Sequence, residues 1–171
     1  MTDTIIYIPT YNAEKTINTL VQKIKDYTKD EYDILIVDDG SRDNTQDIIS
    51  KYKKDKKTKI ILNKINIGYG YNQKIGYNYA IRKGYRYIVM IHGDMQYDPK
   101  NLMPIIKEIH SNKYDAVFGC RMKTALKDGM PLWRYVGNKF LTGCENFVFK
   151  ENINEYHTGF RAFKVSSLKK I

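Results

Sequence analysis

Short apolar runs alternate with amphipathic stretches along most of this 171-residue chain. Residues 5–8 form an uninterrupted apolar run, which is typical of a strand covered on both faces. Ile17, Leu20, Val21 and Ile24 instead fall at helical spacing. The same patterns predict strands over residues 4–9, 32–37, 59–62, 87–91 and 115–119, and helices over 17–27, 43–52, 71–82 and 102–109. This alternation predicts a mostly parallel, Rossmann-like α/β sheet with helices on both faces.

The regular alternation ends after Arg121. A loop over residues 123–131 is followed by helical character over 133–149, a further strand over 156–163 and the first residues of a last helix. The length suits one domain with a substantial core. No apolar run approaches the roughly 18 residues of a membrane span, and the first residues do not resemble a signal peptide. With two cysteines, read as free thiols, we expect a cytoplasmic protein.

The formal net charge of +10 permits three interpretations. Only six of the 29 Lys and Arg residues are arginine, although arginine is favoured for specific phosphate and base recognition. A solvated basic surface is therefore the leading interpretation, and no specific nucleic acid is expected as a partner. Peripheral attraction to an anionic membrane surface is the second interpretation, and nucleic-acid binding is the third.

Polar residues follow the predicted strands, at the sheet edge where ligands bind in parallel α/β folds. They occur at residues 9–12, 38–41, 92–96 and 119–121. Asp38 and Asp39 are adjacent carboxylates in the second of these groups. One of them could cap the next helix, a role that Asp43 could also serve, but capping needs only one such residue. A nucleobase and ribose offer enough donors to engage both carboxylates.

Asp94 follows the predicted strand over residues 87–91, where we expect a buried carboxylate to need a partner. A hard divalent cation such as Mg²⁺ with diphosphate oxygens would satisfy it, and Gln96 could offer a second oxygen to the same ion. Asp98 and Pro99, in contrast, indicate a helix N-cap followed by proline at the first helical position.

Other candidate residues come from weaker patterns. The glycine-rich segment 66–76 lacks the spacing and position of a dinucleotide-binding fingerprint, so Gly68 and Gly70 are interpreted as allowing close approach of a ligand or of a neighbouring strand. Arg161 could clamp phosphate, and Glu155 is a candidate carboxylate near the sugar. The remaining candidates are His157, which as a lone histidine is more often structural, and Trp133 with Arg134. An aromatic side chain after the loop over residues 123–131 suits contact with a sugar or lipid, and a position in the core is equally plausible for it.

Six segments, taken in order, resemble family 2 glycosyltransferases with the GT-A fold, particularly the branch of dolichyl-phosphate mannose and glucose synthases. The resembling segments are residues 9–14, 37–41, 66–70, 92–99, 119–121 and 155–161, which span most of the chain. His92 stands where the family's metal motif usually has its first Asp, and Glu155 stands where an Asp is usual.

The resemblance implies a single GT-A catalytic domain over residues 1–171, with a nucleotide-binding part over about 1–98 and an acceptor side over about 99–171. Since the family's chains commonly continue further, we expect a minimal member or one truncated at the C-terminus. The implied reaction is a metal-dependent inverting transfer from a nucleoside diphosphate sugar, with a UDP-sugar favoured over GDP-mannose, to a polyprenyl phosphate or glycan acceptor. Such a reaction belongs to cell-envelope or glycan biosynthesis.

The resemblance also implies a role for each candidate residue. Asp94 and Gln96 would hold Mg²⁺ or Mn²⁺, Arg161 would offset charge on the leaving group, and Glu155 would act as base or orient Arg161. The nucleotide side would comprise Pro9, Tyr11, Glu14, Asp38, Asp39, Gly68, Gly70 and Asp94, and the acceptor side Arg121, Trp133, Arg134, His157 and Thr158. Two rivals are considered: a nucleotidyltransferase, which normally carries a glycine-rich basic loop after the first strand, and a non-catalytic sugar-nucleotide or nucleic-acid binding module.

Overall fold

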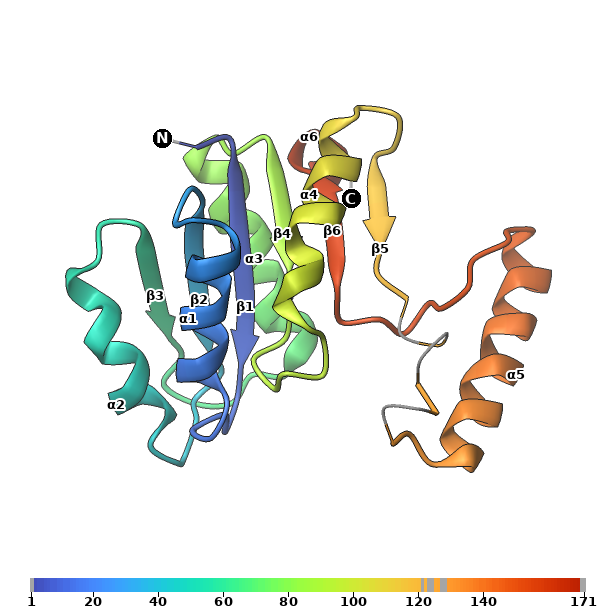
Figure 1. Cartoon of the computed structure of the whole chain (residues 1–171), viewed down its shortest axis with the longest axis horizontal. Coiled ribbons are helices and arrows are strands. Elements are labelled where there is room, and N and C mark those ends of the chain that lie inside the picture. Colours follow the sequence, from blue (N-terminus) through green and yellow to red (C-terminus); the bar gives the residue numbers. More distant parts are fainter. Residues whose placement is uncertain (1, 121, 123–124, 127–128, 170–171) are drawn as a thin grey trace.

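The computed structural model describes residues 2–120, 122, 125–126 and 129–169. Six strands form one sheet in the order β3-β2-β1-β4-β6-β5 (Figure 1). The strands are β1 Thr4–Thr10, β2 Asp33–Asp38, β3 Thr58–Leu62, β4 Tyr87–Met90, β5 Ala116–Phe118 and β6 Arg161–Lys164. β1 to β4 pair in parallel, and β6 runs antiparallel to both β4 and β5. The predicted mostly parallel α/β sheet is therefore confirmed.

The helices connect and cover these strands. They are α1 Ile17–Tyr27, α2 Thr45–Ser50, α3 Tyr69–Lys83, α4 Leu102–His110, α5 Leu132–Phe149 and α6 Val165–Leu168, with 3₁₀ turns at η1 Lys51–Lys54 and η2 Pro99–Asn101. Asp98 is the N-cap of η2, and its side chain accepts a hydrogen bond from the Lys100 backbone N–H, as predicted. None of the helices in the described part of the chain is long and apolar enough to cross a membrane.

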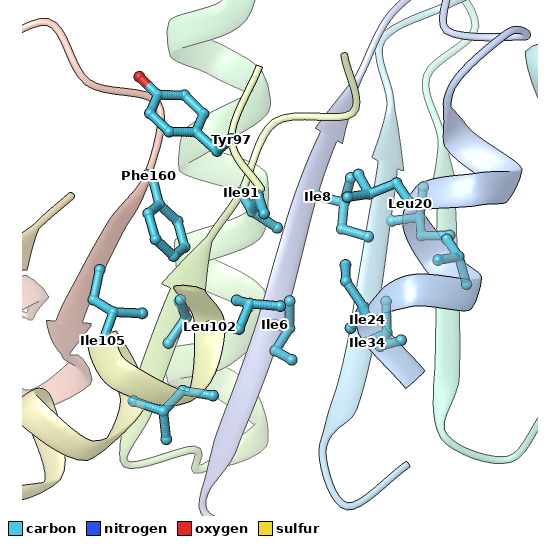
Figure 2. Packing of buried hydrophobic residues seen from close by; sticks show 14 of the residues in the cluster. Ile6, Ile8, Leu20, Ile24, Ile34, Ile91, Tyr97, Leu102, Ile105 and Phe160 are labelled. Carbon is cyan, nitrogen blue, oxygen red and sulfur yellow. The ribbon is translucent and has the colours of Figure 1, made fainter. Parts of the chain in front are cut away.

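The continuous apolar runs arise because both faces of the sheet are covered. Ile6 and Ile8 point to the face that packs against α1 and α4, and this cluster is shown in Figure 2. Ile5 and Tyr7 point to the opposite face, where Ala80 of α3 completes a second buried cluster. Alternate residues of β1 therefore enter two different cores, and all seven residues of the strand are buried.

The C-terminal third confirms the predicted helix and differs from the prediction in the start of its strand. The strand predicted over residues 156–163 begins only at Arg161, because the N–H groups of Gly159 and Phe160 donate to side chains and not to a neighbouring strand. The Gly159 N–H, for example, donates to the Tyr97 hydroxyl at 2.8 Å. The predicted helix after the loop exists as α5, but in Figure 1 it stands away from the sheet on the side of β5.

Candidate active site

A cavity of about 620 Å³ lies at the carboxyl ends of β1, β2 and β4. Parallel strands bring their last residues to one edge, so segments distant in the sequence meet there. The walls come from residues 9–16, Asp39, Asp43, Asn66, Tyr69, Asn72 and 92–94. Of the predicted nucleotide-binding residues, the structure brings together Pro9, Tyr11, Glu14, Asp39 and Asp94 around this cavity.

Asp38 and Asp39 have different surroundings, although they are adjacent and both buried. The Asp38 carboxylate accepts hydrogen bonds from the Ser41 backbone and hydroxyl and from Nε2 of Gln46, close to its own turn, and it does not line the cavity. Asp39 does line the cavity, and its oxygens hold the loop after β3. Its three donors, each at 3.0 Å, are Asn63 Nδ2 and the backbone N–H groups of Ile67 and Gly68. Two adjacent carboxylates are therefore accommodated by the protein's own donors.

Gly40 and Gly68 both lie next to the loop after β3, and glycine is required at the two positions for different reasons. A Cβ on Gly40 would lie 2.5 Å from the backbone carbon of Ile65, so only glycine allows that approach. Gly68 has a φ of +89° at the start of α3, and Gly70 lies within α3. A Cβ on either would have no neighbour within 4 Å, so close approach of a neighbouring strand does not explain these two glycines.

The loop after β1 is tied to the start of α2 through Glu14 and Asp43. Glu14 Oε2 accepts from the backbone N–H and side-chain amide of Asn44. Asp43 in return accepts from the Glu14 N–H at 3.1 Å and from Thr45. Desolvation raises the pKa of Asp43, but the hydrogen bonds from Thr45 and Glu14 outweigh it and lower the pKa below its usual value. This wall of the cavity is accordingly anionic and fixed before any ligand binds.

His92 is packed among aromatic and glycine neighbours at the opposite wall. Its Nε2 lies 2.8 Å from the Tyr69 hydroxyl, which also accepts from the Gln73 side-chain amide. A Cβ on Gly159 would lie 2.6 Å from the imidazole ring, so the ring packs directly against that glycine. Burial raises the pKa of Tyr69, against the opposing charge of Arg161, so the hydroxyl stays protonated. His92 thus links the end of β4 to the segment before β6.

Asp94 is exposed at the cavity rim, so the expectation of a buried carboxylate is wrong. β4 ends at Met90, and the chain leaves the core before it reaches Asp94. Asp94 Oδ1 accepts a hydrogen bond from the Gln96 N–H at 3.1 Å across Met95, whose φ is +61°. Gln96 is also exposed and does not line the cavity.

A second cavity, of about 500 Å³, lies beside β5, and buried Glu155 belongs to its lining. Asp94 and Glu155 therefore line separate cavities. Arg161 begins β6 and donates from Nε to the Thr158 carbonyl at 2.6 Å and from Nη2 to the Tyr156 carbonyl at 3.3 Å. These two bonds fix the guanidinium beside the segment that carries Glu155.

The residues predicted for the acceptor side are dispersed. Trp133 is 71% exposed near the start of α5, and the Arg134 guanidinium lies 5.1 Å from its ring centroid. His157 Nε2 lies 3.2 Å from Glu145 Oε1 of α5. Thr158 is fully buried and bonds to the Phe160 backbone. Arg121 lies outside the described residues.

The sequence and the fold are both similar to those of known proteins. The sequence model of the protein family "Glycosyl transferase family 2" matches residues 5–171 of this chain. The chain belongs to glycosyl transferase family 2. It is 31% identical over 185 residues to the UDP-N-acetylglucosamine--dolichyl-phosphate N-acetylglucosaminyltransferase of Methanococcus voltae, covering 99% of this chain and 73% of the relative.

Solved structures share the fold of this family 2 glycosyltransferase. Glucosyl-3-phosphoglycerate synthase of Mycobacterium tuberculosis superposes with a TM-score of 0.70 at 13% identity, over 98% of this chain and 59% of that one. A mannosyltransferase of Pyrobaculum calidifontis, in complex with GDP-Man and Mn²⁺, gives 0.64 at 18% identity, over 98% and 46%. The chain thus spans about half the length of these solved chains, and its fold is GT-A.

A divalent cation in this glycosyltransferase would have to be held by few protein groups. Within the described ranges, no three His, Cys, Asp or Glu side chains are grouped as metal ligands. Asp94 is nevertheless an exposed carboxylate on the rim of the cavity. Mg²⁺ is commonly bound by one or two carboxylates together with substrate phosphates and water. The protein groups present therefore fit a cation that is coordinated mainly by substrate phosphates and water and is anchored by Asp94.

Several cavity residues were not predicted as ligands from the sequence, among them Asn66, Tyr69, Asn72 and Asp43. Asn72 is buried within α3, accepts a 2.5 Å bond from the Tyr7 hydroxyl and donates to the Val37 carbonyl. A polar residue on the face of a helix that meets the sheet is the signal that could have identified it. Tyr69 gives no comparable signal, because its contact with His92 spans 23 positions.

Proposed function

We propose that this family 2 glycosyltransferase transfers a sugar from a nucleoside diphosphate sugar, with inversion at the anomeric carbon. The observation that carries the proposal is the cavity at the carboxyl edge of the sheet, lined by Asp39, Glu14 and Asp94. Its 620 Å³ lies in the range of small-molecule sites. Asp39 and Glu14 would face the nucleoside, and Asp94 would face the diphosphate.

Asp94 is proposed to hold Mg²⁺ or Mn²⁺ against the diphosphate, with Gln96 offering a weaker oxygen ligand. The bound cation would supply electrostatic stabilisation of the leaving nucleoside diphosphate. Arg161 would add a second positive charge to offset that of the leaving group. Its guanidinium is already held in place by the Thr158 and Tyr156 carbonyls. Its charge also affects Tyr69 at the cavity wall, where it opposes the rise in the Tyr69 pKa.

For the donor we favour a UDP-sugar, with GDP-mannose second. The archaeal relative is named for UDP-N-acetylglucosamine, and the mannosyltransferase structure contains GDP-Man. For the acceptor we favour a polyprenyl phosphate over a saccharide. A hydroxyl acceptor needs a base, whereas a phosphate oxygen is already an anion. Glu155 lines the second cavity, which leaves it better suited to orienting the segment near Arg161 than to taking a proton beside Asp94.

A thermal-shift panel of UDP-, GDP- and TDP-sugars, each with Mn²⁺ or with EDTA, tests the donor and the metal together. Ligands that bind the native state raise the apparent unfolding temperature. We expect one nucleotide class to raise it with Mn²⁺ and to lose most of that shift in EDTA. Release of nucleoside diphosphate, measured under the same two conditions, distinguishes an enzyme from a binding module.

Asp94→Asn should abolish the Mn²⁺-dependent part of the shift and reduce metal-dependent release by roughly 100-fold or more, the scale of losing a transition-state electrostatic contact. Asp98→Asn is the matched control, since Asp98 caps η2 outside the cavity. Unchanged metal dependence in Asp94→Asn would refute the assignment of Asp94.

A further inference from the structure

α5 presents an apolar surface to the solvent. Phe147 is 87% exposed, Trp133 71% and Phe140 70%. Further exposed apolar side chains on the same side of the helix are Leu132, Val136, Leu141 and Val148. Monomeric soluble proteins rarely expose so many large apolar side chains together, and such patches mark interaction sites.

These seven residues lie on one side of the helix. At about 100° per residue, their positions fall within half of the helix circumference. An eighth exposed apolar side chain, Phe149, falls on the other half, where its ring centroid lies 6.1 Å from that of Tyr156. The other half carries Thr142, which is buried, and Glu145, which pairs with His157. Asn146 bonds through both its side-chain amide groups to the backbone of Ile153. α5 is therefore reversed relative to an ordinary surface helix, which buries its apolar stripe against the core.

The charges around the apolar half indicate what covers it. Arg134 and Lys139 lie about 20° beyond its two edges. Lys150 follows the end of the helix and is itself followed by the exposed carboxylate of Glu151. The single carboxylate of α5, Glu145, is on the inward side. A second copy docked on this face would add further cations at its border and no carboxylate of α5 to pair with them, because Glu145 is on the inward side. An apolar face containing Trp and Phe and bordered by cations is instead the pattern of helices that lie in a bilayer interface.

We propose that the apolar face of α5 docks on the surface of a bilayer that contains anionic lipid. The apolar side chains would enter the acyl boundary, and Arg134, Lys139 and Lys150 would meet the head groups. The net charge of +10 would add long-range attraction to such a surface.

Docking through α5 also narrows the acceptor, a step that rests on the proposed function. The Glu145–His157 pair connects α5 to the segment that carries Glu155 and leads into Arg161. In Figure 1, α5 begins at the lower end of the molecule, the end toward which β1 runs. The last residues of β1 belong to the lining of the cavity. A bilayer held there would present a lipid-linked phosphate to the site, so a membrane-borne acceptor is favoured over a soluble saccharide.

Vesicle flotation tests the surface directly. The whole chain is mixed with vesicles of phosphatidylcholine alone, or with phosphatidylglycerol added, at low and high salt. Phe140→Ser combined with Phe147→Ser removes apolar contact, and Ile65→Ser, at a site that is 69% exposed in the loop after β3, is the matched control. Arg134→Gln combined with Lys139→Gln removes two border cations.

We expect the unmodified chain and Ile65→Ser to float with anionic vesicles. The double serine variant should lose binding by roughly tenfold or more, because two exposed phenylalanines no longer enter the lipid. The glutamine pair should lose about fivefold per cation on anionic vesicles only. Thermal unfolding of the serine variant should match the unmodified chain, since both side chains point away from the protein.

Three results would overturn the proposal: no binding of the unmodified chain to any vesicle, equal binding by the double serine variant, or self-association that this variant abolishes without any vesicle binding. The nucleotide-sugar thermal shift is measured on the same samples. Vesicle binding without a nucleotide shift contradicts the proposed function and leaves the docking surface standing. A nucleotide shift without vesicle binding contradicts the docking surface alone.

Discussion

Gly76 of α3 and Gly70 of the same helix should respond to alanine with opposite changes in stability. A Cβ on Gly76 would lie 2.7–2.8 Å from three atoms of the Tyr7 ring, well inside ordinary contact distance. Tyr7 is fully buried in β1, so its ring has no solvent into which it can move. A Cβ on Gly70 would have no neighbour within 4 Å, so the same substitution meets no obstacle there.

The magnitudes decide the sign. Alanine in place of glycine favours a helix by up to about 1 kcal/mol. Overpacking a core costs about 1–3 kcal/mol. Displacing the Tyr7 ring also disturbs its 2.5 Å hydrogen bond to Asn72, and an unsatisfied buried polar group costs about 1–3 kcal/mol more. Gly76→Ala should therefore lower the free energy of unfolding by about 1–5 kcal/mol, and Gly70→Ala should raise it by up to about 1 kcal/mol.

Urea unfolding followed by circular dichroism, without nucleotide, measures both changes. Tyr7→Leu combined with Gly76→Ala should recover part of the loss, because the smaller side chain leaves room for the methyl group. Because Asn72 lines the cavity, Gly76→Ala should also weaken nucleotide binding in the thermal-shift panel. The reasoning is refuted if Gly76→Ala is as stable as the unmodified chain, or if the two alanine variants shift stability in the same direction.

Two further predictions concern carboxylates. Desolvation raises the pKa of Asp55, but the hydrogen bond from Lys25 and bonds from Thr58 and Lys57 outweigh it and lower the pKa to about 2. Since the folded pKa lies below the unfolded one, this carboxylate stabilises the fold above about pH 4, and the contribution is lost as pH falls toward 2. Asp55→Asn should flatten that part of the curve of unfolding free energy against pH, and an unaltered acid limb would contradict it. Asp39→Asn should lower the free energy of unfolding by about 1–3 kcal/mol even without nucleotide, because an amide cannot accept all three hydrogen bonds that hold the loop after β3. An unchanged urea midpoint would show that the loop does not depend on this carboxylate.

The sheet was predictable from sequence because both its faces are covered. Strands buried on both faces give continuous apolar runs, and such runs predicted β1 through β4 to within one residue at each end. The segment before β6 was not predictable in this way. Its backbone groups bond to Tyr97 and Thr158 side chains, and no periodic pattern records bonds of that kind.

The cavity was predictable by rule, but not the state of each carboxylate within it. The ends of parallel strands converge whatever their composition, so Asp39 and Asp94 were expected at one edge. Whether a carboxylate is buried depends on where the strand ends. β4 ends at Met90, and Asp94 is exposed as a result. The contact between His92 and Gly159 joins residues far apart in the chain, and neither residue's neighbours in sequence indicate it.

α5 shows a further limit of periodicity. The spacing of its apolar residues indicates a helix with one apolar side, and for a soluble domain the default inference is that this side faces the core. The direction is instead set by polar side chains on the opposite side. Asn146 bonds to Ile153, and Glu145 bonds to His157, so the polar half is held against the protein and the apolar half must face outward. A sequence pattern therefore defines the two sides of a helix, and the inward-facing side is decided by whichever one finds specific partners. In α5 that is the polar side, which is why the apolar half is left facing outward from the described part of the chain.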